Sequence, residues 1–299
     1  MSLLVVGTGA LACLFAARLA GSGNEVTMLG SWQEGLTALR QAGVRLRDMN
    51  GNTHQYPVKV TDGTNTRRRY SQVLVLVKSW QTKRVAKQLQ RRLTTTGIAL
   101  TLQNGFGNYE TLKEALGQER VALGVTTVGA RTIEPGYVSH TGEGKVMIGF
   151  HPKLDGLGEL LIKAGFQVEM INEPESLLWG KLVINAAINP LTALLRVPNG
   201  ELLSRPAARE LMLEAAREAA LVANKQGISL PYNDPADAVE EVARNTAANN
   251  SSMLQDVLRG TPTEIDAING AIIRVGEALG VSTPVNRILW RLVKSLDQY

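Results

Sequence analysis

The chain has 299 residues, of which 44% are hydrophobic and 20% are charged, and its formal net charge is +5. This length suits two domains, and the composition is ordinary for a soluble globular protein. No apolar run reaches the roughly 18 residues of a membrane span, the N-terminus lacks the basic segment of a signal peptide, and the basic residues form no single stripe. We therefore expect no membrane partner and no nucleic-acid partner.

The cysteine and histidine residues bear on the cellular location of the protein and on whether it binds a metal. The single cysteine, Cys13, excludes an internal disulfide and favours a reducing, cytoplasmic location, with a buried and inert thiol. The three histidines, His54, His140 and His151, are scattered without the spacing of metal ligands, so we expect no metal site.

The first half of the chain alternates short apolar strands with helical segments. The apolar runs predict strands, and the helical periodicity predicts helices at about 10–20 and 81–93. The predicted strands, in chain order, are 3–6, 25–29, 73–77, 98–102, 120–125 and 165–171. Asn50–Gly51 indicates a hairpin turn between 44–48 and 56–60, and 137–140 with 145–149 suggest an antiparallel edge. The alternation favours a parallel, doubly wound sheet.

After about residue 172 the strand signal disappears and long helical patterns follow. A proline lies near the start of four of these patterns, where its missing N–H is tolerated. The predicted helices are 175–195, 206–226, 235–248, 262–279 and 284–297, and the prolines are Pro206, Pro235, Pro262 and Pro284. We predict an α/β domain over 1–172 and an all-α domain over 173–299.

A glycine motif follows the first predicted strand. Gly7, Gly9 and Ala12 form a G-x-G-x-x-A pattern that opens a helix, which permits a tight turn, close approach of a pyrophosphate and close packing of helix on strand. The alternative is a glycine turn without a ligand. In this position the motif predicts a Rossmann-type dinucleotide-binding domain, and its candidate cofactor contacts are Gly7, Thr8, Gly9, Ala10, Leu11 and Ala12.

The end of the second strand bears on which dinucleotide binds. An NAD site usually has Asp or Glu there, but Gly30, Ser31 and Trp32 occupy this region. Because no carboxylate repels a 2′-phosphate and Ser31 could donate to it, we predict NADP(H), although an expected arginine is also missing. Lys78 and Asn104 follow two further strands, at the edge where open sheets bind ligands; taken alone, they fit an exposed lysine and an Asn-Gly turn.

A polar stripe runs through the first helix of the second half. Lys181, Asn185 and Asn189 are spaced four apart in an otherwise apolar run, so they share one face. Either they form an interdomain hydrogen-bond network, or a polar ligand docks against them. A lysine at a partly dry site can have its pKa lowered toward neutrality and can then donate a proton.

Two later polar segments have ordinary structural explanations. "TPTEID" is typical of a capping box with Thr261 as N-cap, Pro262 at N1 and Glu264 at N3. Residues 249–256, "NNSSMLQD", suggest a polar turn between helices, with capping roles for its side chains.

Long segments of the chain nevertheless resemble the ketopantoate reductase family. "KLVINAAINPLTALLRVPNGEL" (181–202) and "NTAANNSSMLQDVLRGTPTEIDAINGAI" (245–272) carry the resemblance, and "GTGALA", "VKSWQ" and "QNGFGN" agree in order. The resemblance implies NADPH-dependent reduction of 2-dehydropantoate to (R)-pantoate, on the route to pantothenate and coenzyme A.

The resemblance also implies roles for individual residues. Lys181 matches the general acid, and Glu264 matches a glutamate that supports catalysis and cofactor binding. The residues that match or extend the substrate-binding set are Asn185, Asn189, Asn199, Asn249 and Ser252. The residues that match cofactor-contacting positions are Lys78, Asn104 and Ala130. The chain departs from the family at Ala12, which replaces a glycine, and at Ser31, which replaces an arginine that often grips the 2′-phosphate.

Two other functions remain open from the sequence. The chain could be another NADP-dependent hydroxyacid or imine reductase of the same two-domain architecture, or a nonenzymatic NADP-binding sensor that also binds a protein. The expected partner is a small keto acid, and the expected assembly is a monomer or a homodimer.

Overall fold

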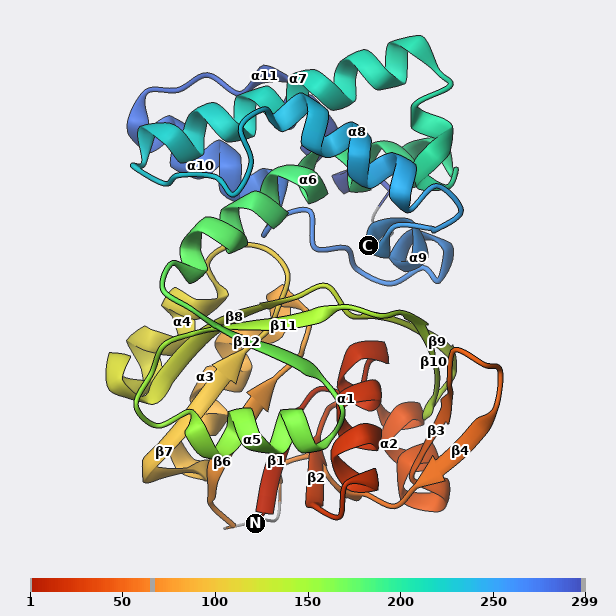
Figure 1. The fold of residues 1–299 in the computed structure, drawn as a ribbon, viewed down its shortest axis with the longest axis vertical. Coiled ribbons are helices and arrows are strands. Elements are labelled where there is room, and N and C mark those ends of the chain that lie inside the picture. Colours follow the sequence, from red (N-terminus) through yellow and green to blue (C-terminus); the bar gives the residue numbers. More distant parts are fainter. Residues whose placement is uncertain (1, 65–67, 297–299) are drawn as a thin grey trace. The chain divides into compact units, whose positions relative to one another are not determined.

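The computed structural model describes residues 2–64 and 68–296 (Figure 1). The chain divides into two compact units. The first comprises Met1–Gln103 with Asn108–Pro174, and the second comprises Asn104–Gly107 with Glu175–Tyr299. The main part of the helical unit therefore begins at Glu175, two residues after the predicted start at 173. The short loop Asn104–Gly107 from the first half of the chain also belongs to this unit.

An eight-stranded sheet forms the centre of the first unit, in the order β12-β11-β8-β7-β6-β1-β2-β5. Neighbouring strands are parallel except for β11, which runs antiparallel to β8. The strands are β1 (Ser2–Val6), β2 (Glu25–Leu29), β5 (Lys59–Thr61), β6 (Tyr70–Val75), β7 (Leu93–Thr101), β8 (Val121–Thr126), β11 (Lys145–Gly149) and β12 (Gln167–Ile171). The predicted Rossmann-type α/β sheet is therefore confirmed.

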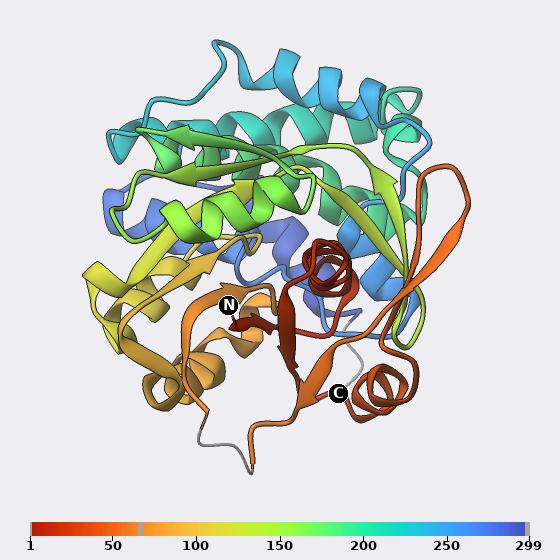
Figure 2. The same ribbon diagram turned by 60° about the horizontal axis from the view of Figure 1, so that its bottom comes forward.

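Helices cover both faces of this sheet because successive side chains of a strand point to opposite sides. Leu3 and Val5 of β1 lie in one apolar core, and Leu4 and Val6 lie in the other. The first core contains residues of α1 (Ala10–Gly21) and α5 (Asp155–Lys163), and the second contains residues of α3 (Thr82–Arg92) and α4 (Asn108–Leu116). Figure 2 shows α1, in dark red, nearly along its axis. The sequence analysis did not predict α4, α5 or α2 (Gln33–Ala42).

A second, four-stranded sheet in the same unit has the order β4-β3-β10-β9. It contains β3 (Val44–Arg47), β4 (Thr53–Tyr56), β9 (Gly129–Glu134) and β10 (Tyr137–Gly142). The predicted antiparallel edge is therefore only partly right: β10 pairs with β9 and β3 in this separate sheet, while β11 lies inside the main sheet between β8 and β12.

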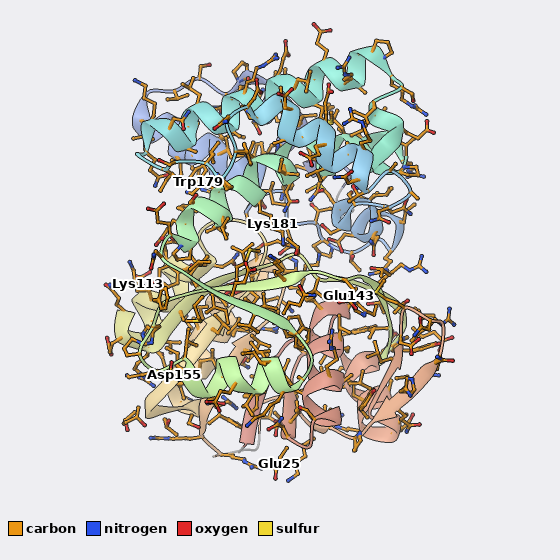
Figure 3. The ribbon with its side chains drawn as sticks, in the orientation of Figure 1. Glu25, Lys113, Glu143, Asp155, Trp179 and Lys181 are labelled. Carbon is orange, nitrogen blue, oxygen red and sulfur yellow. The ribbon has the colours of Figure 1, made fainter. Side chains whose placement is uncertain are left out.

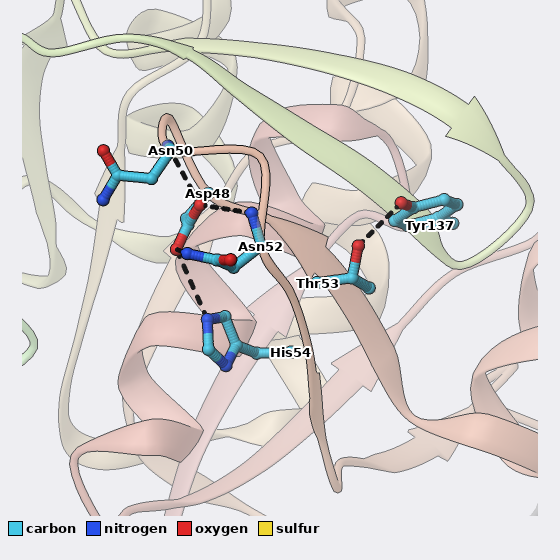
Figure 4. A network of polar contacts seen from close by, with 6 residues as sticks. All are labelled: Asp48, Asn50, Asn52, Thr53, His54 and Tyr137. Carbon is cyan, nitrogen blue, oxygen red and sulfur yellow. Dashed lines mark hydrogen bonds and ion pairs between the residues drawn. The ribbon is translucent and has the colours of Figure 1, made fainter.

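The predicted hairpin around Asn50–Gly51 joins β3 and β4, but its second strand is Thr53–Tyr56 and not the predicted 56–60. Lys59 and Val60 instead belong to β5, which pairs with β2 in the main sheet. Gly51 has φ of +88°, which favours glycine. Asp48 accepts hydrogen bonds through Oδ1 from the backbone N–H groups of Asn50 and Asn52, at 2.9 and 2.8 Å, and its Oδ2 lies 3.3 Å from Nε2 of His54 (Figure 4). These contacts stabilise the turn, so the segment has a structural role.

The second unit is built from helices around an apolar core of its own. Its elements are α6 (Pro174–Leu195), the 3-10 helix η3 (Asn199–Leu202), α7 (Pro206–Lys225), α8 (Pro235–Asn245), α9 (Ser252–Leu258), α10 (Asn269–Leu279) and α11 (Pro284–Lys294). By length and composition α6 could cross a membrane, but 72% of its most apolar window is buried inside the protein. That burial is typical of a core helix.

Two predictions for this unit are wrong. Residues 252–258 form α9, and the helix predicted over 262–279 begins only at Asn269. Thr261 does not cap a helix, because its N–H and its Oγ1 both donate to the carbonyl of Asp256, at 3.0 and 3.2 Å, and so terminate α9. Ile268, with φ of −102° and ψ of −94°, breaks helical geometry before α10. Glu264 therefore lies in a turn and is not the N3 residue of a capping box.

Candidate functional site

The glycine loop between β1 and α1 is tightly packed at its first glycine. Gly7 has φ of +129°, and a Cβ there would lie 2.8 Å from the carbonyl oxygen of Leu76 and 3.1 Å from Cβ of Ala12. Its N–H donates to the carbonyl of Leu29 at 2.8 Å, which ties the loop to β2. Ala12 is fully buried, so a small residue at this third position lets α1 approach the sheet.

The second glycine of the loop, Gly9, is not required by backbone geometry or packing. Gly9 has φ of −81°, which any residue adopts, and a Cβ built on it would meet nothing within 4 Å. The fold itself therefore does not require glycine here. Gly9 precedes the amides of Ala10 and Leu11 at the start of a 12-residue helix, and it has no side chain with which to cap them. Open space before a helix N-terminus suits a dinucleotide pyrophosphate, so these residues fit that group.

The segment after β2 lies against this loop. A Cβ on Gly30 would lie 2.5 Å from Cγ2 of Thr8, so the two segments are in close contact. Ser31 and Trp32 are exposed, and Oγ of Ser31 accepts a hydrogen bond from Nη2 of Arg84 at 2.6 Å. Arg84 lies 53 positions later in the chain, and no local sequence signal connects it with Ser31.

A buried hydrogen-bond network holds the loop that carries Lys78. Gln103 donates through Nε2 to the carbonyl of Val77 at 2.9 Å and to Oγ1 of Thr82 at 2.8 Å. Thr82 in turn donates to Oδ1 of Asn108 at 2.7 Å. Lys78 is half-buried and directly precedes the 3-10 helix η1 (Ser79–Gln81). The network positions this loop, and the sequence analysis did not identify Gln103, Thr82 or Asn108.

Ala130, the other predicted cofactor contact of the first unit, lies in β9. It is half-buried, pairs in register with His140 of β10, and packs against the core that contains α1. The four-stranded sheet therefore positions it.

The segment Asn104–Gly107, in the loop after β7, belongs to the helical unit. The N–H of Phe106 donates to the carbonyl of Ala267 at 2.8 Å, and its ring centroid lies 5.2 Å from that of Trp179. Gly105 has φ of +82°, and a Cβ there would lie 2.7 Å from the same carbonyl, so this position requires glycine. Asn104 itself is half-buried.

The predicted polar stripe lies on α6. Lys181 and Asn185 are half-buried, and Asn189 is buried. Figure 3 labels Trp179 and Lys181, which both belong to this helix. Burial lowers the pKa of Lys181 from 10.5 to about 8, and the carboxylate of Glu264 opposes this shift by raising it. Glu264 is only 5% exposed. An amine with a pKa near neutrality and a buried carboxylate that acts on it are typical of an acid–base site.

Ser252 is placed by its neighbours on α6 and α9. Ser251 is the N-cap of α9, and its Oγ accepts from the N–H of Leu254 at 3.1 Å. Thr192 of α6 donates to Oγ of Ser251, at 2.7 Å, and lies within hydrogen-bond distance of the carbonyl of Asn189, at 3.0 Å. Ser251 therefore does the capping and connects α9 with α6. Ser252, half-buried, is the first residue of the helix.

Asn199 and Asn249 lie next to each other through their backbones. The N–H of Asn199 donates to the carbonyl of Asn249 at 3.0 Å, and Nδ2 of Asn199 donates to Oγ1 of Thr246 at 2.9 Å. Asn199 is buried, whereas Asn249 is exposed. Its contact with Thr246 gives Asn199 a structural role.

Within residues 2–64 and 68–296, no group of three or more His, Cys, Asp or Glu side chains could hold a metal ion. The candidate site residues offer the amines of Lys78 and Lys181, several amides and hydroxyls, and the buried carboxylate of Glu264.

Comparison with known proteins gives matches along the whole chain. A family model described as "Ketopantoate reductase PanE/ApbA" matches residues 3–153, and a second, described as its C-terminal part, matches residues 175–297. The chain belongs to the ketopantoate reductase family. Among its relatives, the 2-dehydropantoate 2-reductase of Archaeoglobus fulgidus is 36% identical over 302 residues, which cover 98% of this chain and 97% of the relative.

Solved structures of the family agree with this fold. The PanE/ApbA family ketopantoate reductase of Ralstonia eutropha JMP134 is 32% identical, with a TM-score of 0.90 over 99% of this chain and 98% of that one. D-mandelate dehydrogenase with NADH and anilino(oxo)acetate is 25% identical, with a TM-score of 0.93 over the same shares. The ketopantoate reductase architecture is thus also that of an enzyme named for another 2-hydroxy acid.

Proposed function

We propose that the protein catalyses the NADPH-dependent reduction of 2-dehydropantoate to (R)-pantoate, a step toward pantothenate and coenzyme A. The likeness to relatives named 2-dehydropantoate 2-reductase extends over nearly the whole chain. The observation that carries the proposal is the environment of the Lys181 amine. Burial lowers its pKa to about 8, and the negative charge of Glu264 partly offsets this shift. A proton donor of that pKa suits carbonyl reduction near neutral pH.

The first unit carries the proposed dinucleotide-binding residues. The open space at Gly9 and the small residues around it fit a pyrophosphate. The residues of this unit that would hold the cofactor are Gly7, Thr8, Gly9, Ala10, Leu11, Ala12, Ser31, Lys78 and Ala130. When bound, NADPH supplies the hydride that reduces the C2 ketone of the substrate.

The second unit supplies the proposed proton donor and the substrate contacts. Lys181 donates a proton from Nζ to the ketone oxygen as negative charge develops there, and before transfer its positive charge stabilises that oxygen. Glu264 raises the pKa of Lys181 and so keeps more of the amine protonated at neutral pH. The amides and the hydroxyl that would bind the carboxylate and distal hydroxyl of the keto acid belong to Asn185, Asn189, Asn199, Asn249 and Ser252.

A second enzymatic function is reduction of a different 2-keto acid. The TM-score of 0.93 to a D-mandelate dehydrogenase complex favours this alternative, since its name indicates an aryl substrate. A nonenzymatic NADP-binding sensor is the third candidate, but it provides no reason for a half-buried lysine of lowered pKa.

One assay separates the three candidates. Purified protein is mixed with NADPH and either 2-dehydropantoate or phenylglyoxylate, and oxidation is followed at the nicotinamide absorbance band. Rapid turnover of 2-dehydropantoate supports the proposal. Turnover of phenylglyoxylate alone supports the second function, and cofactor binding without turnover of any keto acid supports the third.

The cellular location, the assembly and the absence of nucleic-acid and membrane partners are part of the same proposal. We expect a cytoplasmic monomer or homodimer that binds neither nucleic acid nor membrane. The buried, unpaired Cys13 supports a reducing environment, and the scattered basic residues argue against a nucleic-acid surface.

A further inference from the structure

Arg84 and Ser31 form a polar pair at the surface of the first unit. Nη2 of Arg84 donates to Oγ of Ser31 at 2.6 Å, and both residues are exposed. Arg84 projects from α3, whose buried residues Val85 and Leu89 pack into the core of the sheet. The helix is therefore anchored, and it brings a guanidinium group to the end of β2.

The pair lies beside the glycine loop. Gly7 donates to the carbonyl of Leu29 at the end of β2, and the side chain of Thr8 fills the space where a Cβ of Gly30 would lie. Ser31 is the next residue. In Rossmann-type domains this is where the ribose of the adenosine lies, with its 2′ substituent near the residues that follow β2.

The chemistry at this position favours a phosphate over a hydroxyl. Residues 30–32 contain no carboxylate that could accept a hydrogen bond from a ribose 2′-hydroxyl. Ser31 has a hydroxyl, and Arg84 has a planar group of five N–H donors suited to phosphate oxygens. The next helix, α2, begins at Gln33, and its positive end favours an anion there. Glu34 in its first turn is exposed and opposes this effect with a single charge.

We propose that Arg84, held by Ser31, binds the 2′-phosphate of NADPH and makes the protein prefer NADPH to NADH. The arginine that the sequence lacks after β2 is thus replaced by one from α3. This inference rests on the proposed use of a nicotinamide dinucleotide, but it does not depend on which keto acid is reduced.

Binding measurements without any keto acid test the inference. Dissociation constants for NADPH and NADH are measured by isothermal titration calorimetry or nicotinamide fluorescence, and 2′,5′-ADP with 5′-AMP serve as fragments. Arg84→Ala should weaken NADPH and 2′,5′-ADP by about 10- to 100-fold, the range for loss of a hydrogen bond between charged groups. It should leave NADH and 5′-AMP unchanged. Ser31→Asp should reverse the preference, because a carboxylate repels the phosphate and accepts from the hydroxyl.

Arg91→Ala is the matched control. Arg91 is exposed on the same helix two turns further along, so its removal changes the net charge equally without touching Ser31. It should leave the NADPH constant within about twofold of the unmodified protein, as expected for a screened distant charge. Equal losses for NADPH and NADH in Arg84→Ala, no loss at all, or equal wild-type affinities for both dinucleotides would each overturn the inference. Failure to reduce 2-dehydropantoate would instead refute the proposed function and leave these constants interpretable.

Discussion

Asn269 donates through Nδ2 to the backbone carbonyl of Ala186 at 2.9 Å. Pro190 lies inside α6 and has no N–H for that carbonyl, so the side chain of Asn269 replaces the missing helical hydrogen bond. Asn269 is fully buried and also donates to Oδ1 of Asn286 at 3.0 Å. The contact ties the start of α10 to the part of α6 that follows Lys181.

Replacement of Asn269 with Ala should reduce the free energy of unfolding by about 1–3 kcal/mol, because a buried carbonyl loses its donor. Urea titration followed by circular dichroism measures this loss. Asn245→Ala, at the exposed end of α8, is the control and should change stability by about 0.5 kcal/mol or less. Equal stabilities of the two variants would show that the Asn269 contact contributes little.

Lys181→Ala should lower kcat for 2-dehydropantoate reduction by roughly 10²- to 10⁴-fold, the usual contribution of a general acid. The dissociation constant for NADPH should remain nearly unchanged. Steady-state kinetics and calorimetry measure the two quantities separately. A normal kcat in this variant would refute the assignment of Lys181 as the proton donor.

The pH dependence of the reaction should report Lys181. Only the protonated amine can donate, so kcat/KM for reduction should fall as pH rises above about 8. Glu264→Gln removes the carboxylate that raises the pKa of Lys181, and the descending limb should therefore move to lower pH. A purely structural role for Glu264 would lower stability without moving this limb, so the position of the limb decides between the two roles.

The two glycines of the loop should respond differently to alanine. Gly7→Ala should destabilise the protein by about 1–3 kcal/mol, because φ of +129° is strained for alanine and its Cβ would lie 2.8 Å from a carbonyl oxygen. Gly9→Ala should leave stability nearly unchanged but weaken NADPH binding, because its methyl group enters the open space before α1. Thermal unfolding and NADPH titration measure these effects. Unaltered NADPH affinity in Gly9→Ala would place the pyrophosphate elsewhere.

Cys13 should be unreactive in the folded protein. Burial raises the pKa of its thiol to about 12, so the thiolate is scarce at pH 8. A colorimetric disulfide reagent should therefore label only a small fraction of this single thiol within minutes under native conditions. The urea-unfolded protein is the internal control and should react fully, and rapid native labelling would contradict the burial of Cys13.

Local patterns were enough to predict much of this protein. The strands at 3–6 and 25–29 and the helix at 10–20 follow from apolar periodicity and a glycine turn, which are properties of adjacent residues. The strand predicted at 98–102 is longer in the structure, where β7 spans Leu93–Thr101. The same locality explains the failure at 262–279. Pro262 and Glu264 have the composition of a helix start, but Thr261 bonds back to Asp256 and the chain turns again before Asn269.

The Rossmann-type α/β unit, the helical unit, the glycine loop and the polar stripe of α6 can all be predicted from sequence patterns, because each pattern involves residues of one element or of neighbouring elements. Which distant residues complete them depends on the folded arrangement. Arg84 reaches Ser31 across 53 positions, and Asn269 reaches Ala186 across 83. Neither pair has a local signature, since the chain between them must fold before their hydrogen bonds can form.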